Sequence, residues 1–151
     1  MKFYKIVCLA LLMTFNCFTQ AETFFKKDFS GKYTEQFIGG GPKYEVNIKN
    51  GNKEGLEIFW YESGPKKIQT NYVNDKEDGI WNQWYENGQM KLEAHYKAGR
   101  EHGSFKQWYD SGQQRAQSNF VNGKKEGKEL SWEKDGKLKS EITYKNGEVV
   151  K

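Results

Sequence analysis

The feature that most constrains this chain is a repeat of 24 residues that runs without a gap from residue 47 onward. A fixed period of this length is the signature of a repeat architecture, in which each unit packs against its neighbours. We divide the array into units 47–70, 71–94, 95–118 and 119–142, with a partial fifth unit at 143–151. Three columns recur in all four full units: Gly55, Gly79, Gly103 and Gly127; Gly64, Gly88, Gly112 and Gly136; and Trp60, Trp84, Trp108 and Trp132.

A degenerate copy of the repeat is expected at residues 22–46. Gly31 and Gly40 lie one period before Gly55 and Gly64, and Phe37 falls in the column that holds Tyr61. The terminal units of a repeat array are atypical because they must cap it. We therefore interpret residues 22–46 as a degenerate N-terminal capping repeat.

Each unit is predicted to be a β-hairpin. In the first full unit the strands are expected at residues 56–61 and 66–73, joined by a three-residue loop at 62–64. A type I turn followed by a left-handed glycine suits a serine before Gly64, which a two-residue primed turn does not. Longer loops, such as residues 50–55, are expected between hairpins. The predicted fold is all-β: tandem hairpins stacked into an elongated, twisted antiparallel sheet.

The loop length determines which side chains share a face of the sheet. Trp60 is expected opposite Lys66, with Ile68 and Tyr72 on the tryptophan side, and Met90, Leu92, Ala94 and Tyr96 with them in the next unit. The other side is expected to show rings beside a basic column. Its candidate binding residues are Tyr61, Lys67, Trp81, Tyr85, Lys91, Phe105, Tyr109 and Arg115, with Phe59 and Lys139 alongside.

This aromatic and basic surface has two interpretations. Tyrosine, tryptophan and arginine are enriched at interface hot spots, so the surface could bind an acidic protein, a glycan or lipid headgroups. Alternatively, the rings pack under the lysine stems in cation–π contacts. The sheet edges offer a third possibility, the addition of a strand from another chain.

The first 21 residues have the three-part plan of a secretory signal peptide. Lys2 and Lys5 precede a ten-residue apolar run, and a polar segment ends at Ala21. The run is half the length needed to span a membrane. Cys17 could mark a lipoprotein, but Phe15 and Asn16 before it fit a lipid-attachment site poorly. We expect a cleaved signal and a periplasmic or secreted protein.

The composition excludes several kinds of chemistry. Both cysteines, Cys8 and Cys17, lie in the segment expected to be removed, which excludes disulfides, thiol catalysis and cysteine-bound metals from the mature chain. His95 and His102 do not make a metal site by themselves, and His102 is expected to be a solvated loop residue. We predict no metal, no cofactor and no catalytic residues.

Charge and hydropathy argue against a nucleic-acid-binding protein and against a disordered chain. The 24 basic and 20 acidic residues give a formal charge of +4, too balanced for a nucleic-acid-binding surface. Hydrophobic residues make up only 36%, but aromatic residues reach 16%. Disordered chains are poor in aromatic residues, so this chain is expected to fold around rings.

The motif G-x-W-x-x-W-Y-E-N-G-Q-x-K at residues 79–91, with N-G-K-x-x-G at 122–127, resembles the bacterial variant of the MORN repeat. Asp75 and Glu133 depart from that pattern, in a glycine and a tyrosine column. A weaker similarity, to choline-binding cell-wall repeats, has a period nearer twenty.

The MORN resemblance implies stacked hairpins, recognition of a protein or membrane surface and no catalysis, in a family often labelled antitoxin-like. We expect an exported binding protein with a protein partner, in an antitoxin- or immunity-like role; the alternative is binding to a cell-wall glycan or an anionic membrane surface.

Overall fold

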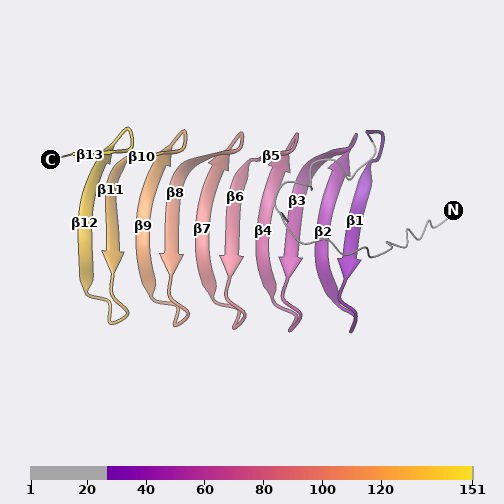
Figure 1. Cartoon of the computed structure of the whole chain (residues 1–151), viewed down its shortest axis with the longest axis horizontal. Coiled ribbons are helices and arrows are strands. Elements are labelled where there is room, and N and C mark those ends of the chain that lie inside the picture. Colours follow the sequence, from indigo (N-terminus) through magenta and orange to yellow (C-terminus); the bar gives the residue numbers. More distant parts are fainter. Residues whose placement is uncertain (1–26, 151) are drawn as a thin grey trace, which may run out of the picture.

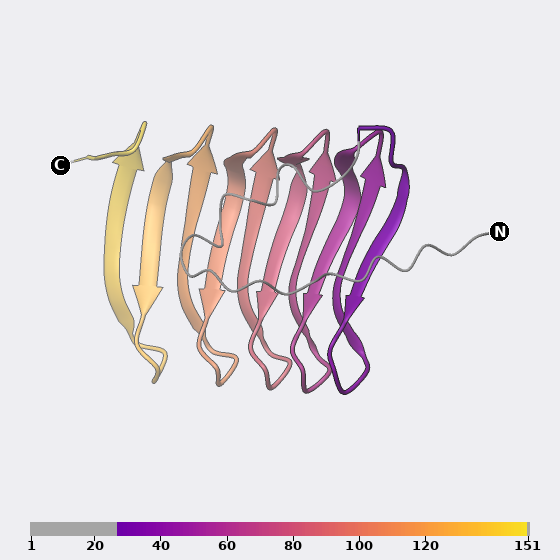
Figure 2. The same cartoon turned by 45° about the vertical axis from the view of Figure 1, so that its right-hand side comes forward.

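The computed structural model describes residues 27–150, and the regular structure in that range consists of β-strands without a helix. Thirteen antiparallel strands form one open sheet, which is longest across the strands (Figure 1). The turned view in Figure 2 shows a single layer whose strands bow in a common direction. The all-β fold of stacked hairpins is confirmed. The predicted signal peptide lies outside the described residues.

Five hairpins follow one another in chain order. Their strands are β1 (Gly31–Gln36) with β2 (Pro42–Lys49), β3 (Asn52–Trp60) with β4 (Lys66–Val73), β6 (Gly79–Trp84) with β7 (Met90–Lys97), β8 (Arg100–Trp108) with β9 (Gln114–Val121), and β11 (Gly127–Trp132) with β12 (Leu138–Lys145). The two-residue strands β5 (Lys76–Glu77), β10 (Lys124–Lys125) and β13 (Glu148–Val149) pair with the ends of β4, β9 and β12.

The turn inside each hairpin has the predicted three-residue form. In the second hairpin the Tyr61 N–H donates to the Pro65 carbonyl at 2.9 Å, and the Gly64 N–H donates to the Tyr61 carbonyl at 3.0 Å. Gly64 has φ of 108°, in the region that favours glycine. The same two hydrogen bonds recur in the other four hairpins, including the first, where Phe37 takes the place of Tyr61.

A one-residue bulge follows this turn. Trp60 pairs with Lys66 as predicted, but the next pair is Phe59 with Ile68, so Lys67 is the extra residue. The same shift occurs in all five hairpins. Because successive residues of a strand point to opposite faces, one extra residue moves the rest of that strand to the other face.

The predicted composition of the tryptophan side was therefore wrong for the second strand of each hairpin. The affected residues, Ile68, Tyr72, Leu92, Ala94 and Tyr96, lie on the same face as Phe59 and Tyr61, whereas Met90 stays opposite Trp84. We call the side that carries Tyr61, Tyr85 and Tyr109 the tyrosine face, and the side that carries the Trp60 column the tryptophan face.

The connections between hairpins are tighter than predicted. Residues 50–55 were expected to form a longer loop, but the turn consists of Asn50 and Gly51 alone, and β3 begins at Asn52. Both turn residues have positive φ, 51° and 82°, as in a type I′ turn, which asparagine followed by glycine favours. Four later turns have the same geometry, at 74–75, 98–99, 122–123 and 146–147.

The glycine column of Gly55 forms a second bulge. Ile48 pairs with Lys53 and Val46 with Glu57, so two extra residues are accommodated between these pairs on β3. Gly55, with φ of 87°, lies within this irregularity. As a result Lys53 and Glu57 lie on the same face, and the equivalent residues of later repeats do so too.

Few side chains are fully buried in this one-layer sheet, and those described lie between β2 and β7. The buried residues of the tyrosine face include Val46, Ile48, Thr70, Ala94 and Glu57, whereas Ile58 lies on the tryptophan face. Each hairpin packs mainly against its two neighbours, as expected for a repeat array.

Candidate functional site

The eight candidate binding residues share one face. Trp81 pairs with Ala94 and Phe105 with Ser118, which places both rings on the tyrosine face. Tyr61, Tyr85 and Tyr109 extend the same face toward the turns, with Lys67, Lys91 and Arg115 beside them at the bulge. The face was thus predicted correctly for these residues, and their role in binding stays a prediction.

A ladder of cations covers the tyrosine rings. Lys67 Nζ lies 5.4 Å from the centre of the Tyr61 ring, Lys91 Nζ lies 5.4 Å from that of Tyr85, and the Arg115 guanidinium carbon lies 5.8 Å from that of Tyr109. These are the cation–π contacts of the packing interpretation. Lys67 and Arg115 nevertheless remain exposed, so the same groups are accessible to a partner.

The tyrosine hydroxyls join consecutive repeats. Those of Tyr61, Tyr85 and Tyr109 each donate to the backbone carbonyl of the tryptophan 23 residues later, at 2.9 Å. Burial, with the nearby Glu86 carboxylate, raises the pKa of Tyr61 above its usual value. The tyrosine hydroxyls therefore stabilise the contact between repeats. The tyrosine rings and the cations beside them are the groups of this column that a ligand could contact.

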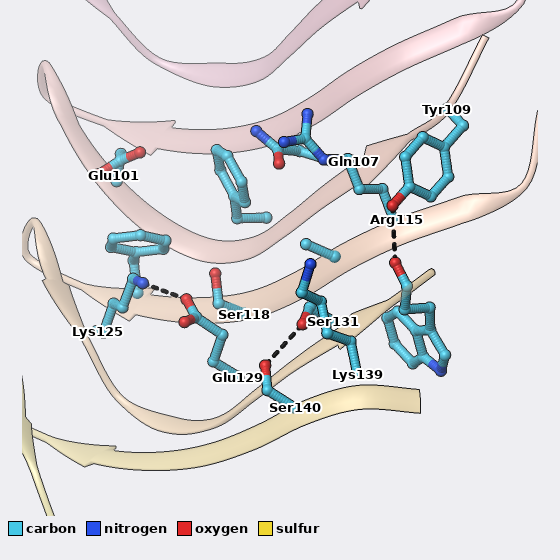
Figure 3. Close-up of a pocket in the computed structure, with 14 residues that line it drawn as sticks. Glu101, Gln107, Tyr109, Arg115, Ser118, Lys125, Glu129, Ser131, Lys139 and Ser140 are labelled. Atoms are coloured by element: carbon cyan, nitrogen blue, oxygen red, sulfur yellow. Dashed lines mark hydrogen bonds and ion pairs between the residues drawn. The ribbon is translucent and has the colours of Figure 1, made fainter. Parts of the chain in front are cut away.

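A hollow of about 560 Å³ opens on the tyrosine face over β8 to β12 (Figure 3). Phe105 and Phe120 meet edge to face in it, with ring centres 5.7 Å apart. Its polar lining comes from Gln107, Ser118, Ser131 and Ser140, and the Ser131 and Ser140 hydroxyls lie 2.6 Å apart. Rings and hydroxyls therefore meet on one accessible surface.

The hollow exists because small residues replace large ones in the C-terminal repeats. Ala116 and Ser140 occupy the column that holds Ile68 and Leu92 in earlier repeats. Ser131 likewise takes the place of Phe59. Because the backbone pairing is the same in each repeat and the side chains are smaller, the tyrosine face is left open over the last two full repeats.

Charged groups ring the hollow. Lys125 and Glu129 form an ion pair at one end, and Lys139 is paired with Glu133 at 3.2 Å. Glu101 and Arg115, at opposite ends of the hollow, are the charged lining residues for which the structure describes no ion pair in residues 27–150 (Figure 3). Burial raises the pKa of Glu101, against the opposing effect of the Lys125 charge.

The prediction from sequence missed Glu101, Phe120, Lys125 and the serines of the hollow. Glu101 belongs to the column of Lys53, Glu77 and Lys125. In the first and fourth full repeats a lysine of this column pairs with Glu57 or Glu129, whereas in the middle two a glutamate stands beside Trp81 or Phe105. This difference between repeats was visible in the sequence, but the bulge that aligns the two columns was not anticipated.

Glu57 forms a buried polar cluster in the N-terminal half. Its carboxylate accepts hydrogen bonds from the Tyr44 hydroxyl at 2.7 Å and from Lys53 Nζ at 2.6 Å. The Lys53 ammonium also lies 4.7 Å from the centre of the Tyr72 ring. Burial and the Glu57 carboxylate raise the pKa of Tyr44 and of Tyr72. Because the Glu57 carboxylate, the Tyr44 hydroxyl and the Lys53 ammonium are paired with one another and little exposed, we interpret this cluster as structural.

Both histidines occupy structural columns. His95 Nδ1 lies 3.0 Å from the Ser104 hydroxyl. The equivalent residue of the preceding repeat is Asn71, whose side-chain amide donates to the Asp78 carbonyl. His102 was expected to be solvated, but its Nδ1 is buried and without a hydrogen-bond partner in the described part of the chain. Within residues 27–150, no group of three or more potential ligands is placed to hold a metal ion. No helix described there could cross a membrane.

Comparison with known families supports the division of the chain into repeats. A family model described as MORN repeat variant matches residues 53–74, 77–98, 101–122 and 125–146, which together make up more than half of the chain. Each matched segment begins at the column of Lys53 and Glu101 and ends at the first residue of the next two-residue turn. A search of curated proteins gave no significant match.

Proposed function

Because the chain belongs to the MORN repeat variant family, whose repeats generally bind other molecules, we propose that it is a non-catalytic protein that holds a protein partner on its tyrosine face. The observation that carries this proposal is the gathering of rings and accessible cations on one face, beside the hollow. Tyrosine, tryptophan and arginine are enriched among the few residues that dominate the binding energy of protein interfaces.

The state of the polar groups also supports a recognition surface. The tyrosine hydroxyls are engaged by backbone carbonyls, and most acidic groups near the hollow are engaged by lysines. These bonds position the tyrosine rings and pair Lys125 and Lys139 before a partner arrives. A surface ordered in advance loses less entropy on binding.

The proposal extends to location and role. The signal-like segment at residues 1–21 supports export, with a mature chain that begins at Glu22 and acts in the periplasm or outside the cell. An immunity-like role follows if the partner is a toxin. Expression of the full chain, fractionation and mass analysis of the N-terminus test the export step; an uncleaved chain in the cytoplasm would contradict it.

Capture from envelope extract tests the binding function. We expect the mature chain to retain a partner that the double variant Lys67→Glu/Lys91→Glu loses. Lys97→Glu/Lys145→Glu is the matched control, because it makes the same charge change at strand ends on the tryptophan face. If both double variants retain the same proteins as the wild type, the tyrosine face is not the binding surface.

The basic column also supports the alternative function, which is binding to an anionic membrane or to a cell-wall glycan. Lys67, Lys91, Arg115 and Lys139 occupy equivalent positions at the bulges of successive hairpins. Adsorption to anionic vesicles that salt abolishes would support the membrane, because such attraction is screened. Sedimentation with purified peptidoglycan would support the glycan.

A further inference from the structure

We propose, resting on the function above, that the hollow over β8 to β12 binds an extended segment of the protein partner that carries a basic, an apolar and an acidic side chain at alternate positions. The basic side chain faces Glu101, the apolar one rests on Phe105 and Phe120, and the acidic one faces Arg115.

The charges of the hollow specify this pattern. Lys125 with Glu129, and Lys139 with Glu133, neutralise each other. Glu101 and Arg115 are left to act on a ligand, one negative and one positive. Charge complementarity at an interface selects the partner and fixes its orientation. A segment with opposite charges at its two ends therefore fits, in one direction only.

The spacing of these two residues matches an extended chain. Glu101 pairs with Tyr96 and Gln107 with Leu92, four positions apart on β7, or about 13 Å. Arg115 adjoins Ala116, the partner of Gln107, so it lies near that second row. In an extended peptide, residues i and i+4 are also about 13 Å apart, and i, i+2 and i+4 point to the same side.

The apolar part of the lining fits the middle of such a segment. It consists of the Phe105 and Phe120 rings and the Ala116 methyl group. A hollow of about 560 Å³ is within the range of ligand-binding sites.

The polar part of the lining favours an extended backbone over a helical one. Gln107, Ser118, Ser131 and Ser140 supply donors and acceptors. An extended segment needs such partners for its own N–H and C=O groups, whereas a helix has satisfied most of them internally.

Binding of a defined peptide tests this inference. The probe is a capped, dye-labelled Ser-Lys-Ser-Phe-Ser-Glu-Ser, titrated with the mature chain and followed by fluorescence anisotropy. We expect saturable binding that weakens about three- to tenfold in Glu101→Gln and in Arg115→Gln, and likewise when glutamine replaces both charged residues of the peptide. Lys97→Gln, on the tryptophan face, should bind as the wild type does.

Two further variants guard against loss of folding. Ala116→Leu fills the hollow with the residue that the preceding repeat carries as Leu92, so it should fold and yet lose the peptide. Glu101→Lys should prefer a peptide in which glutamate replaces the lysine, because the charge complement is restored. Rescue of this kind would not follow from a purely structural role of Glu101.

The outcomes separate this inference from the proposed function. No saturable binding to the wild type, or equal binding to Ala116→Leu, overturns the peptide site. Capture that depends on Lys67 and Lys91 would then still support a partner on the tyrosine face. Displacement of the peptide by an uncharged N-acetylglucosamine tetramer, with sugar affinity unchanged in Glu101→Gln and Arg115→Gln, would assign the hollow to a glycan and also overturn it.

Discussion

The hydroxyl of Tyr85 donates to the backbone carbonyl of Trp108 in the next hairpin at 2.9 Å. Tyr61 and Tyr109 make the same bond to Trp84 and Trp132. The tyrosine that follows the tryptophan in three repeats is therefore a connector between units. The array loses this donor at its two ends, where Phe37 and Glu133 occupy the column.

Removal of these hydroxyls should weaken the stack. We expect Tyr85→Phe and Tyr109→Phe each to lower the free energy of unfolding by about 1 kcal/mol, the usual net value of one hydrogen bond. Thermal melts followed by circular dichroism measure the change. Tyr96→Phe is the matched control, since the structure describes no hydrogen bond from its hydroxyl within residues 27–150; an equal loss there would contradict the connector role.

The first hairpin offers the reverse experiment. Phe37 lies 23 residues before Trp60, as Tyr61 does before Trp84, and its turn has the same two hydrogen bonds. Phe37→Tyr should supply the missing donor and raise the free energy of unfolding by about 0.5–1 kcal/mol. The same melts measure it, and no gain would show that the first hairpin does not follow the geometry of the others.

The period predicted the strands and the turn inside each hairpin, because both depend on local chemistry. A glycine three residues after the tyrosine specifies that turn with little tertiary help. The two-residue turns between hairpins, such as Asn50 and Gly51, were instead predicted as longer loops. The distribution of side chains between the faces was only partly predictable. The bulge at Lys67 and the irregularity at Gly55 are set by pairing with neighbouring strands, and each changes which residues share a face.

The hollow was beyond prediction for a related reason. Ala116, Ser131 and Ser140 are small residues in columns where other repeats carry large ones. They open one surface only because the bulges bring their columns to the same face. Charge pairing around that surface depends on the same alignment. The sequence therefore did not show that Lys125 pairs with Glu129 while no ion pair is described for Glu101 in residues 27–150.

Two equivalent ion pairs should differ in strength. The Lys53 and Glu57 side chains are 19% and 5% exposed, against 34% and 23% for Lys125 and Glu129. Glu57→Ala leaves Lys53 and the Tyr44 hydroxyl without their acceptor, so we expect a loss of about 3 kcal/mol. Glu129→Ala, the matched control, should cost about 1 kcal/mol or less. Urea unfolding compares the two, and equal losses would contradict a structural role specific to Glu57.

His102 occupies a position where the other repeats have a hydrogen-bond acceptor. At the equivalent positions Glu54, Asp78 and Glu126 accept a hydrogen bond from the first residue of the next two-residue turn, at 2.7–3.1 Å. His102 stands where Asn122 would find such an acceptor, and its Nδ1 is buried without a partner in the described residues. We expect His102→Glu to raise the free energy of unfolding by about 1 kcal/mol at pH 7. Thermal melts check this, and a lower melting temperature would show that the imidazole is needed there.

The stability of the sheet should depend on pH through Glu77 and Glu101. Burial raises the pKa of both carboxyls; Glu57 adds to the effect at Glu77, while Lys53 and Lys125 oppose it at Glu77 and Glu101 respectively. A raised folded-state pKa means that the protonated form is favoured by folding. Its contribution is fully present below the ordinary glutamate pKa and is lost as the pH rises through the folded-state pKa.

Glutamine mimics the protonated carboxyl at every pH. We therefore expect Glu77→Gln and Glu101→Gln to raise the melting temperature at pH 7, with a gain that shrinks toward pH 4. Glu133→Gln is the control, because Glu133 is exposed and paired with Lys139, and it should give no such gain. Melts from pH 4 to pH 8 measure the trend. A gain that is the same at both ends of this range would mean that the two carboxyls do not titrate with folding.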